Sequence, residues 1–156
     1  MNSYKLKIAF CHPKYWLAWS GIFTLFISSF LPYSALLFIG RQLGRGAAFF
    51  AKKRGYIARR NIELCFPALS KKEIEQKVRL NFENSGIALL EMGMAWFWPS
   101  WRVRGLLKVR GQEHVDQAII NGQGMLFLGA HFLTLEMGAR AVGLVQPCNA
   151  VYRKHS

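Results

Sequence analysis

The sequence has few cysteines, and none of them is placed to build a site. Its three cysteines, Cys11, Cys65 and Cys148, lie far apart and form no CxxC pair or His-Cys cluster. This pattern argues against a disulfide framework and a zinc centre, and it indicates a reducing compartment. We therefore expect each cysteine to be a small buried apolar residue rather than a nucleophile.

Acidic residues are also scarce. Only 8 Asp and Glu stand against 21 Lys and Arg in 156 residues, which gives a formal net charge of +13, and 52% of the residues are hydrophobic. A chain that is both apolar and strongly basic suits an anionic membrane surface or an acidic partner. Nucleic acid is the competing partner. It is not expected here, because no recognition motif interleaves the basic residues with exposed aromatic ones.

Charged residues are missing altogether from Tyr15 to Gly40, although Pro32 divides this stretch. It is about 26 residues long, and a helix needs only roughly 20 to cross a bilayer. We predict that residues 1–40 form a membrane anchor with a membrane helix, either spanning or re-entrant, with Trp16 and Trp19 at the interface. A cleaved signal peptide is less favoured, because no small-residue cleavage site follows the apolar run. The many basic residues after the stretch predict that the remainder faces the cytoplasm.

Helical patterns dominate the next sixty residues. The segment from Leu36 to Arg60 has an apolar side and a basic side, as in a helix that lies against anionic headgroups. Ser70 with Glu73 three positions later is typical of a capping box. From Lys71 to about Trp98 apolar residues recur at helical spacing, which predicts a long amphipathic helix with its Met and aromatic residues in the core.

The last third of the sequence reads as strands alternating with helices. Short apolar runs at Leu106 to Val109, Met125 to Leu128 and Asn149 to Tyr152 predict strands. Helical patterns lie between them, at Glu113 to Ile120 and Leu133 to Gly143. A strand, a helix and a further strand make a β-α-β unit, which implies a parallel sheet. The predicted fold class is therefore α/β, with an amino-terminal membrane helix.

His131 follows the predicted strand Met125 to Leu128 and precedes a helix whose first turn holds Glu136. Two side chains separated by five positions do not lie on the same face of a continuous helix. His131 and Glu136 can therefore meet only if His131 precedes the helix. The carboxylate could then fix the imidazole tautomer and leave the other ring nitrogen free to take a proton. A structural, hydrogen-bonded His131 is the alternative reading. Thr134 is predicted to cap the helix.

Five stretches of the sequence form a recognisable set: His12 to Leu17, Asn61 to Pro67 with Cys-Phe-Pro, Glu91 to Pro99 with Trp-Phe-Trp-Pro, His131 to Glu136, and Gln146 to Arg153. Together they resemble one family, the late acyltransferases of lipid A biosynthesis, of the HtrB type that adds a lauroyl chain. The resemblance covers about His12 to Arg153, nearly the whole chain. The Trp-Phe-Trp-Pro and Cys-Phe-Pro motifs are more specific for this family than the spacing of His131 and Glu136.

The resemblance implies transfer of a fatty acyl group from an acyl carrier protein thioester to a hydroxyl of a phosphorylated lipid A precursor. It places the enzyme at the cytoplasmic face of the bacterial inner membrane, among anionic lipids. His131 would be the general base, and Glu136 would orient it. Arg153 would bind substrate phosphate or carboxylate groups, with a solvated arginine at a strand end as the alternative. No metal and no cofactor is implied. No Ser, Thr or Cys looks paired with His131, so direct transfer without an acyl-enzyme is expected.

Family members are about twice this length, so residues 41–156 are expected to be the amino-terminal part of a catalytic domain. Acyl-chain length stays open, with a palmitoleoyl-transferring relative as the alternative to lauroyl. A second alternative is a catalytically silent, membrane-associated fragment.

Overall fold

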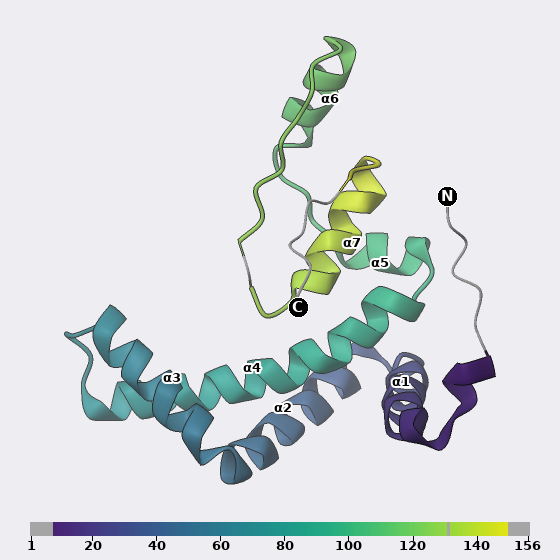
Figure 1. Cartoon of the computed structure of the whole chain (residues 1–156). Coiled ribbons are helices and arrows are strands. Elements are labelled where there is room, and N and C mark those ends of the chain that lie inside the picture. Colours follow the sequence, from purple (N-terminus) through teal and green to yellow (C-terminus); the bar gives the residue numbers. More distant parts are fainter. Residues whose placement is uncertain (1–7, 131, 150–156) are drawn as a thin grey trace.

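The computed structural model describes residues 8–130 and 132–149, and these residues form helices joined by turns and extended segments (Figure 1). Two short 3-10 helices, η1 (Ile8–Cys11) and η2 (Pro13–Tyr15), precede the first α-helix. The α-helices are α1 (Trp16–Ser28), α2 (Tyr33–Phe50), α3 (Lys52–Cys65), α4 (Lys71–Phe97), α5 (Ser100–Leu106), α6 (Gln112–Ile120) and α7 (Leu135–Val145).

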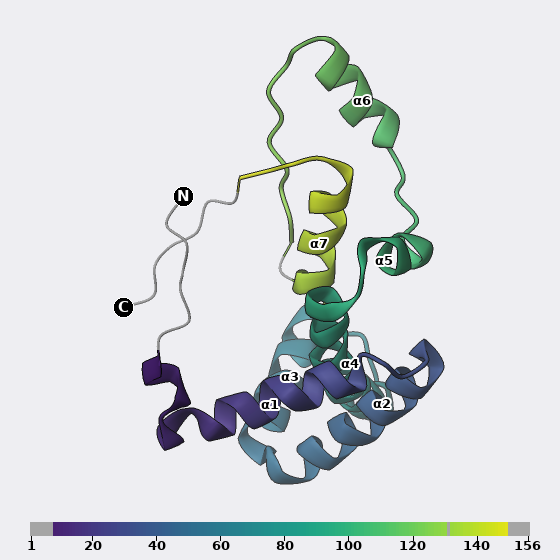
Figure 2. The ribbon, with the colours of Figure 1, turned by 90° about the vertical axis from the view of Figure 1, so that its right-hand side faces the viewer.

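The long helix α4 is the centre of the fold, since α1, α2, α3 and α7 all pack against it. Its start is the predicted capping box: the Ser70 side chain accepts from the Glu73 N–H, and the Glu73 carboxylate accepts from the Ser70 N–H at 2.8 Å. The core lies around its carboxyl-terminal half, where Leu36, Leu90, Met94, Trp98 and Val103 are buried. Helix α6 projects away from the other helices in both ribbon views (Figures 1 and 2).

Helices α2 and α4 approach so closely that glycine is required at the contact. A Cβ added at Gly44 would lie 2.1 Å from the Phe82 carbonyl oxygen, and one added at Gly86 would lie 2.1 Å from the Gly40 carbonyl oxygen. Both distances are far below van der Waals contact, so any larger residue would push the two helices apart. An ion pair beside this contact joins Arg45 on α2 to the buried Glu83 on α4 at 2.8 Å.

The predicted α/β class is wrong for the described residues, which contain helices and no strand. Met125 to Leu128 is not in regular secondary structure, and Leu126 and Leu128 are 94% and 96% exposed rather than buried. An apolar run becomes a strand only when another strand satisfies its backbone groups, and none of the described segments does so. Leu106 is the last residue of α5, and most of the third predicted strand, from residue 150 on, lies outside the described residues.

The transmembrane helix expected within Tyr15 to Gly40 is also corrected. Among the helices that the structure describes, none combines the length with the apolar character needed to cross a membrane. The uncharged stretch is broken into α1 and α2 at Pro32, which has no N–H to donate and disfavours helical geometry in the residue before it. The predicted helix from Leu36 to Arg60 is likewise divided, at Ala51.

The three cysteines are exposed, which contradicts the prediction that they are buried.

Candidate active site

Glu136, the predicted orienting carboxylate, lies in the first turn of α7. A negative charge is favoured there because unpaired backbone N–H groups point out of the helix start. Thr134 is the N-cap residue of α7, as predicted, but its side chain makes no capping hydrogen bond. His131 and Arg153 lie outside the described residues, and their predicted roles stay predictions.

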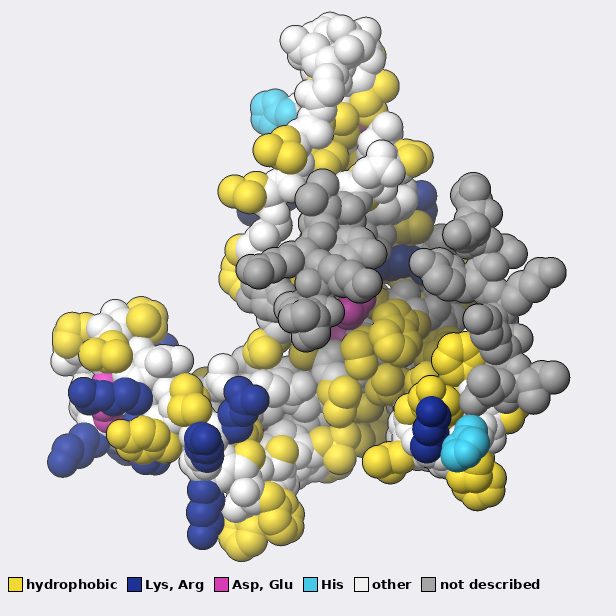
Figure 3. All heavy atoms as spheres, viewed as in Figure 1, with side chains coloured by type: hydrophobic (Ala, Val, Ile, Leu, Met, Phe, Trp, Pro, Cys, Tyr) yellow, Lys and Arg dark blue, Asp and Glu magenta, His cyan; other side chains and the backbone are white. Residues whose placement is uncertain are grey.

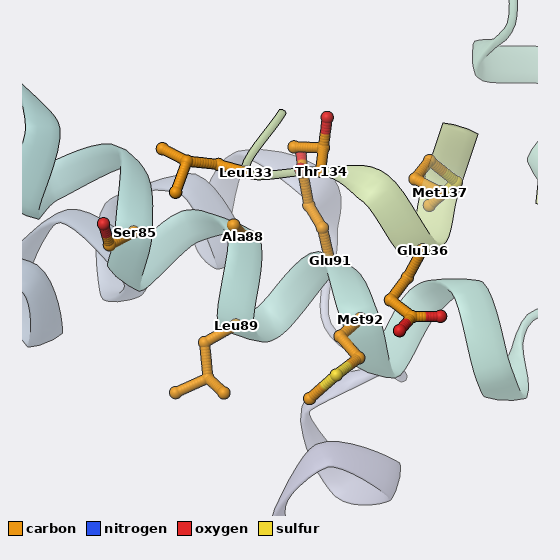
Figure 4. Close-up of a pocket in the computed structure, with 9 residues that line it drawn as sticks. All are labelled: Ser85, Ala88, Leu89, Glu91, Met92, Leu133, Thr134, Glu136 and Met137. Atoms are coloured by element: carbon orange, nitrogen blue, oxygen red, sulfur yellow. The ribbon is translucent and has the colours of Figure 1, made fainter. Parts of the chain in front are cut away.

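A pocket of about 260 Å³ lies between α4 and the beginning of α7, and Glu136 is part of its wall (Figure 4). Most of the lining is apolar. Its polar side chains come from Ser85 and Glu91 on α4 and from Thr134 and Glu136 on the α7 side. The lining consists of Ser85, Ala88, Leu89, Glu91, Met92, Leu133, Thr134, Glu136 and Met137. An apolar pocket with a few polar groups suits a ligand that combines an alkyl chain with hydrogen-bonding groups.

Arginine side chains hold α7 in place. Arg140, one turn after Glu136, donates from Nη2 to the Trp98 carbonyl oxygen at 3.2 Å and to Ser100 Oγ at 3.3 Å. Arg104 on α5 donates to the Leu144 carbonyl oxygen at 2.7 Å. Met137 and Leu144 add apolar contacts with the core. These contacts fix the helix that carries Glu136 against the corner between α4 and α5.

Trp98 forms the centre of that corner. It is only 4% exposed, and its indole N–H donates to the Ser29 carbonyl oxygen at 2.6 Å. The Arg102 guanidinium stacks over the same indole at 3.7 Å from the ring centroid and donates to Ser29 O and Leu31 O. The core position predicted for the aromatic residues of this segment is therefore confirmed for Trp98 but not for Trp96, which is 47% exposed. Trp98 ties the end of α1 to α4 and α5.

Glu91 is the part of the pocket that sequence reasoning did not assign. Tyr33, the first residue of α2, donates its hydroxyl to Glu91 Oε1 at 2.8 Å. Burial first, and then the hydrogen bond and the charge of Glu91, raise the pKa of Tyr33 to about 12. The tyrosine therefore stays a neutral donor at physiological pH. The two residues are 58 positions apart, so no local sequence signal could have revealed the pair.

Two surfaces outside the pocket are also distinctive. Helix α1 exposes large apolar side chains, and basic side chains gather around α3 at the far end of the molecule (Figure 3). The exposed residues of α1 include Trp16, Leu17, Trp19, Phe23 and Ile27, and the exposed basic residues of α3 include Lys52, Lys53, Arg54 and Arg60. Among the described residues, no group of three His, Cys, Asp or Glu side chains is placed to hold a metal ion.

Comparison with known proteins finds one family. The family model described as bacterial lipid A biosynthesis acyltransferase matches residues 4–156. Two curated proteins of Escherichia coli strain K12, a lipid A biosynthesis palmitoleoyltransferase and a lipid A biosynthesis lauroyltransferase, are each 45% identical over 152 residues. In both cases the match covers 97% of this chain and 50% of the relative.

A lipid A biosynthesis acyltransferase of Haemophilus influenzae is 40% identical over 146 residues, which cover 92% of this chain and 46% of that protein. The chain thus spans about half the length of the curated relatives it matches. No solved structure matches it significantly.

Proposed function

Because this chain belongs to the bacterial lipid A biosynthesis acyltransferase family, we propose that its protein transfers a fatty acyl chain to a hydroxyl of a lipid A precursor. The observation that carries the proposal is 45% identity to named lipid A acyltransferases across almost the whole chain. The mainly apolar pocket beside Glu136 also supports it, because both substrates of such a reaction carry alkyl chains.

The proposed acyl donor is the thioester of acyl carrier protein. Acyl carrier protein is acidic, and the net charge of +13, with basic side chains exposed on α3, gives complementary electrostatics for such a partner. The same charge suits a phosphorylated acceptor lipid and anionic headgroups. We place the protein at the cytoplasmic face of the inner membrane, with the exposed apolar side of α1 and the basic side of α3 in contact with the lipid surface.

In the proposed mechanism His131 takes the proton of the acceptor hydroxyl while that oxygen attacks the thioester carbonyl carbon. Glu136 accepts a hydrogen bond from the other ring nitrogen and stabilises the imidazolium. The C–S bond then breaks, the acyl ester forms, and the proton passes from His131 to the departing thiolate. Arg153 is the candidate for binding phosphate groups of a substrate.

The transferred chain is proposed to be lauroyl. The palmitoleoyltransferase is equally identical to this chain, so palmitoleoyl is the alternative. Competition between the two carrier-protein thioesters for the same acceptor lipid separates them. A preference for palmitoleoyl would replace the lauroyl assignment and leave the reaction class unchanged.

The decisive experiment uses membranes that contain the complete gene product, a radiolabelled acyl carrier protein thioester and a lipid A precursor. We expect transfer by the wild-type protein and a rate at least ~100-fold lower in His131→Ala, because general-base catalysis typically contributes 10²–10⁴-fold. Glu136→Gln should lower the rate by a smaller factor, since the imidazole is still present. Glu113→Gln, an exposed acid on α6, is the matched control.

Transfer that survives in His131→Ala would refute the assignment of the base. If the 156-residue chain alone shows no transfer while the complete gene product does, the silent-fragment alternative holds for this chain.

A further inference from the structure

Glu91 and Glu136 face the same pocket from opposite sides. Glu91 extends from α4 toward the segment that carries Leu133 and Thr134, and Glu136 extends from α7 back toward α4 (Figure 4). The two carboxylates thus reach the pocket from helices that are far apart in sequence. Glu91 is placed beside the proposed reaction site without belonging to the predicted His131 and Glu136 pair.

The partner of Glu91 is unusual for this chain. Other carboxylates of α3 and α4 have cationic or capping partners: Glu63 pairs with Arg60, Glu75 with Arg59, Glu83 with Arg45 and Arg79, and Glu73 belongs to the capping box. Within the described part of the chain, no Lys, Arg or His nitrogen lies within 4.0 Å of the carboxylate of Glu91 or Glu136. Glu91 has instead the neutral hydroxyl of Tyr33.

This arrangement leaves hydrogen-bonding capacity in the pocket. A carboxylate has about four acceptor positions on its two oxygens, and Tyr33 occupies one of them, on Oε1. The remaining positions are open to a donor on a ligand that enters the pocket. Two carboxylates also repel a phosphate from this pocket. A mainly apolar pocket with open acceptor positions fits a hydrogen-bond donor, such as a hydroxyl, on a molecule that also carries an alkyl chain.

We propose that Glu91 contacts the acceptor lipid, accepting a hydrogen bond from a hydroxyl of that lipid. Tyr33 acts as a positioning residue that holds the Glu91 carboxylate in the pocket. The contact orients the acceptor so that its reacting hydroxyl lies beside Glu136. This inference rests on the proposed function, since it names part of the acceptor-binding site of that reaction.

The test is steady-state kinetics of the complete gene product with the lipid acceptor and the acyl carrier protein thioester varied separately. Glu91→Leu, which keeps the apolar bulk, should raise KM for the acceptor by at least ~10-fold, because a hydrogen bond to a charged group is lost. KM for the thioester should stay within about 2-fold. Tyr33→Phe should raise KM for the acceptor by a smaller factor, because the Glu91 carboxylate is still present but is no longer held by the Tyr33 hydroxyl.

Glu91→Gln is the conservative variant. Its amide oxygen still accepts a hydrogen bond, so it should recover part of the acceptor affinity lost in Glu91→Leu. Glu113→Gln is again the control and should leave both KM values unchanged. An acceptor that keeps the reacting hydroxyl but lacks the hydroxyl contacted by Glu91 should give the same KM with wild type and Glu91→Leu, because the group that Glu91 contacts is then absent.

The outcomes separate the two proposals. If wild type transfers no acyl group to lipid, the proposed function fails, whatever the variants do. If wild type is active but Glu91→Leu leaves KM for the acceptor unchanged, the Glu91 contact is refuted. Equal rises in both KM values, with a lower melting temperature and no recovery in Glu91→Gln, would likewise refute it and assign Glu91 to the packing of α4 on α2.

Discussion

Substitution of Gly44 by alanine is expected to separate α2 from α4, the helix that forms one wall of the pocket. The added Cβ would lie 2.1 Å from the Phe82 carbonyl oxygen and 2.7 Å from the Glu83 Cα. These neighbours are backbone atoms of α4, so no side chain can rotate away, and the helices must move apart by roughly 1 Å. A gap of that size removes a quarter to a half of the attraction of each displaced contact.

The expected change in the free energy of unfolding of Gly44→Ala is the sum of two opposing effects. Overpacking costs about 1–3 kcal/mol and occasionally more, and backbone-to-backbone overlap belongs at the upper end of that range. Alanine in place of glycine within a helix stabilises that helix by up to about 1 kcal/mol. We expect Gly44→Ala to lower the free energy of unfolding by about 2 kcal/mol, a large part of the usual 5–15 kcal/mol.

Gly46 provides the matched control, because it lies on the same helix and a Cβ there would meet nothing within 4 Å. Gly46→Ala should therefore be neutral or stabilising by up to about 1 kcal/mol. The assay is chemical denaturation of the purified protein, followed by far-UV circular dichroism. Equal denaturation midpoints for the two variants would show that α2 and α4 do not pack as closely as described.

Two further predictions concern the ion pair and the α7 contacts. The pKa of Glu83 is lowered, chiefly by its hydrogen bond with Arg45, so this pair stabilises the fold at pH above the ordinary carboxylate value of 4.5 and is lost as pH falls further. Chemical denaturation at pH 7 should thus give a higher free energy of unfolding for wild type than for Glu83→Gln. If the same difference in free energy of unfolding persists at pH 2, the pairing is contradicted. Arg140→Leu should lower the transfer rate by about 10-fold and Arg140→Lys by less, because α7 loses its bonds to Trp98 and Ser100. Rates equal to wild type in Arg140→Leu would refute that role.

Some local patterns in the sequence predicted local structure correctly. The capping box at Ser70 and the length of α4 depend on residues within a few positions of one another, so their patterns can be read directly. The helices expected at Glu113 to Ile120 and Leu133 to Gly143 are confirmed as α6 and α7, with ends shifted by one or two residues.

The wrong predictions have two causes, the absence of a distant partner and a helix break inside the predicted segment. The apolar run Met125 to Leu128 has the composition of a strand, yet composition cannot show whether a neighbouring strand is present to pair with it. The uncharged stretch Tyr15 to Gly40 has the apolarity of a membrane helix, but Pro32 divides it into two shorter helices. The close packing of Gly40 and Gly44 on Gly86 had a readable signal, two small residues four positions apart, whose partner lies on another helix.

The candidate site likewise combines a residue that a local motif reveals with one that depends on a distant contact. Glu136 could be singled out because its spacing from His131 lies within one local motif, whereas Glu91 gains its position from Tyr33, 58 residues away. The position of α7 depends on Arg140 and Arg104, and the approach of α2, which carries Tyr33, to α4 depends on glycine. Each of these contacts lies outside the catalytic spacing, so loss of any of them should move an acidic side chain while leaving the motif intact. Variants at Arg140 or Arg104 should therefore lower the transfer rate through Glu136, whereas separation of α2 from α4 should change acceptor binding through Glu91.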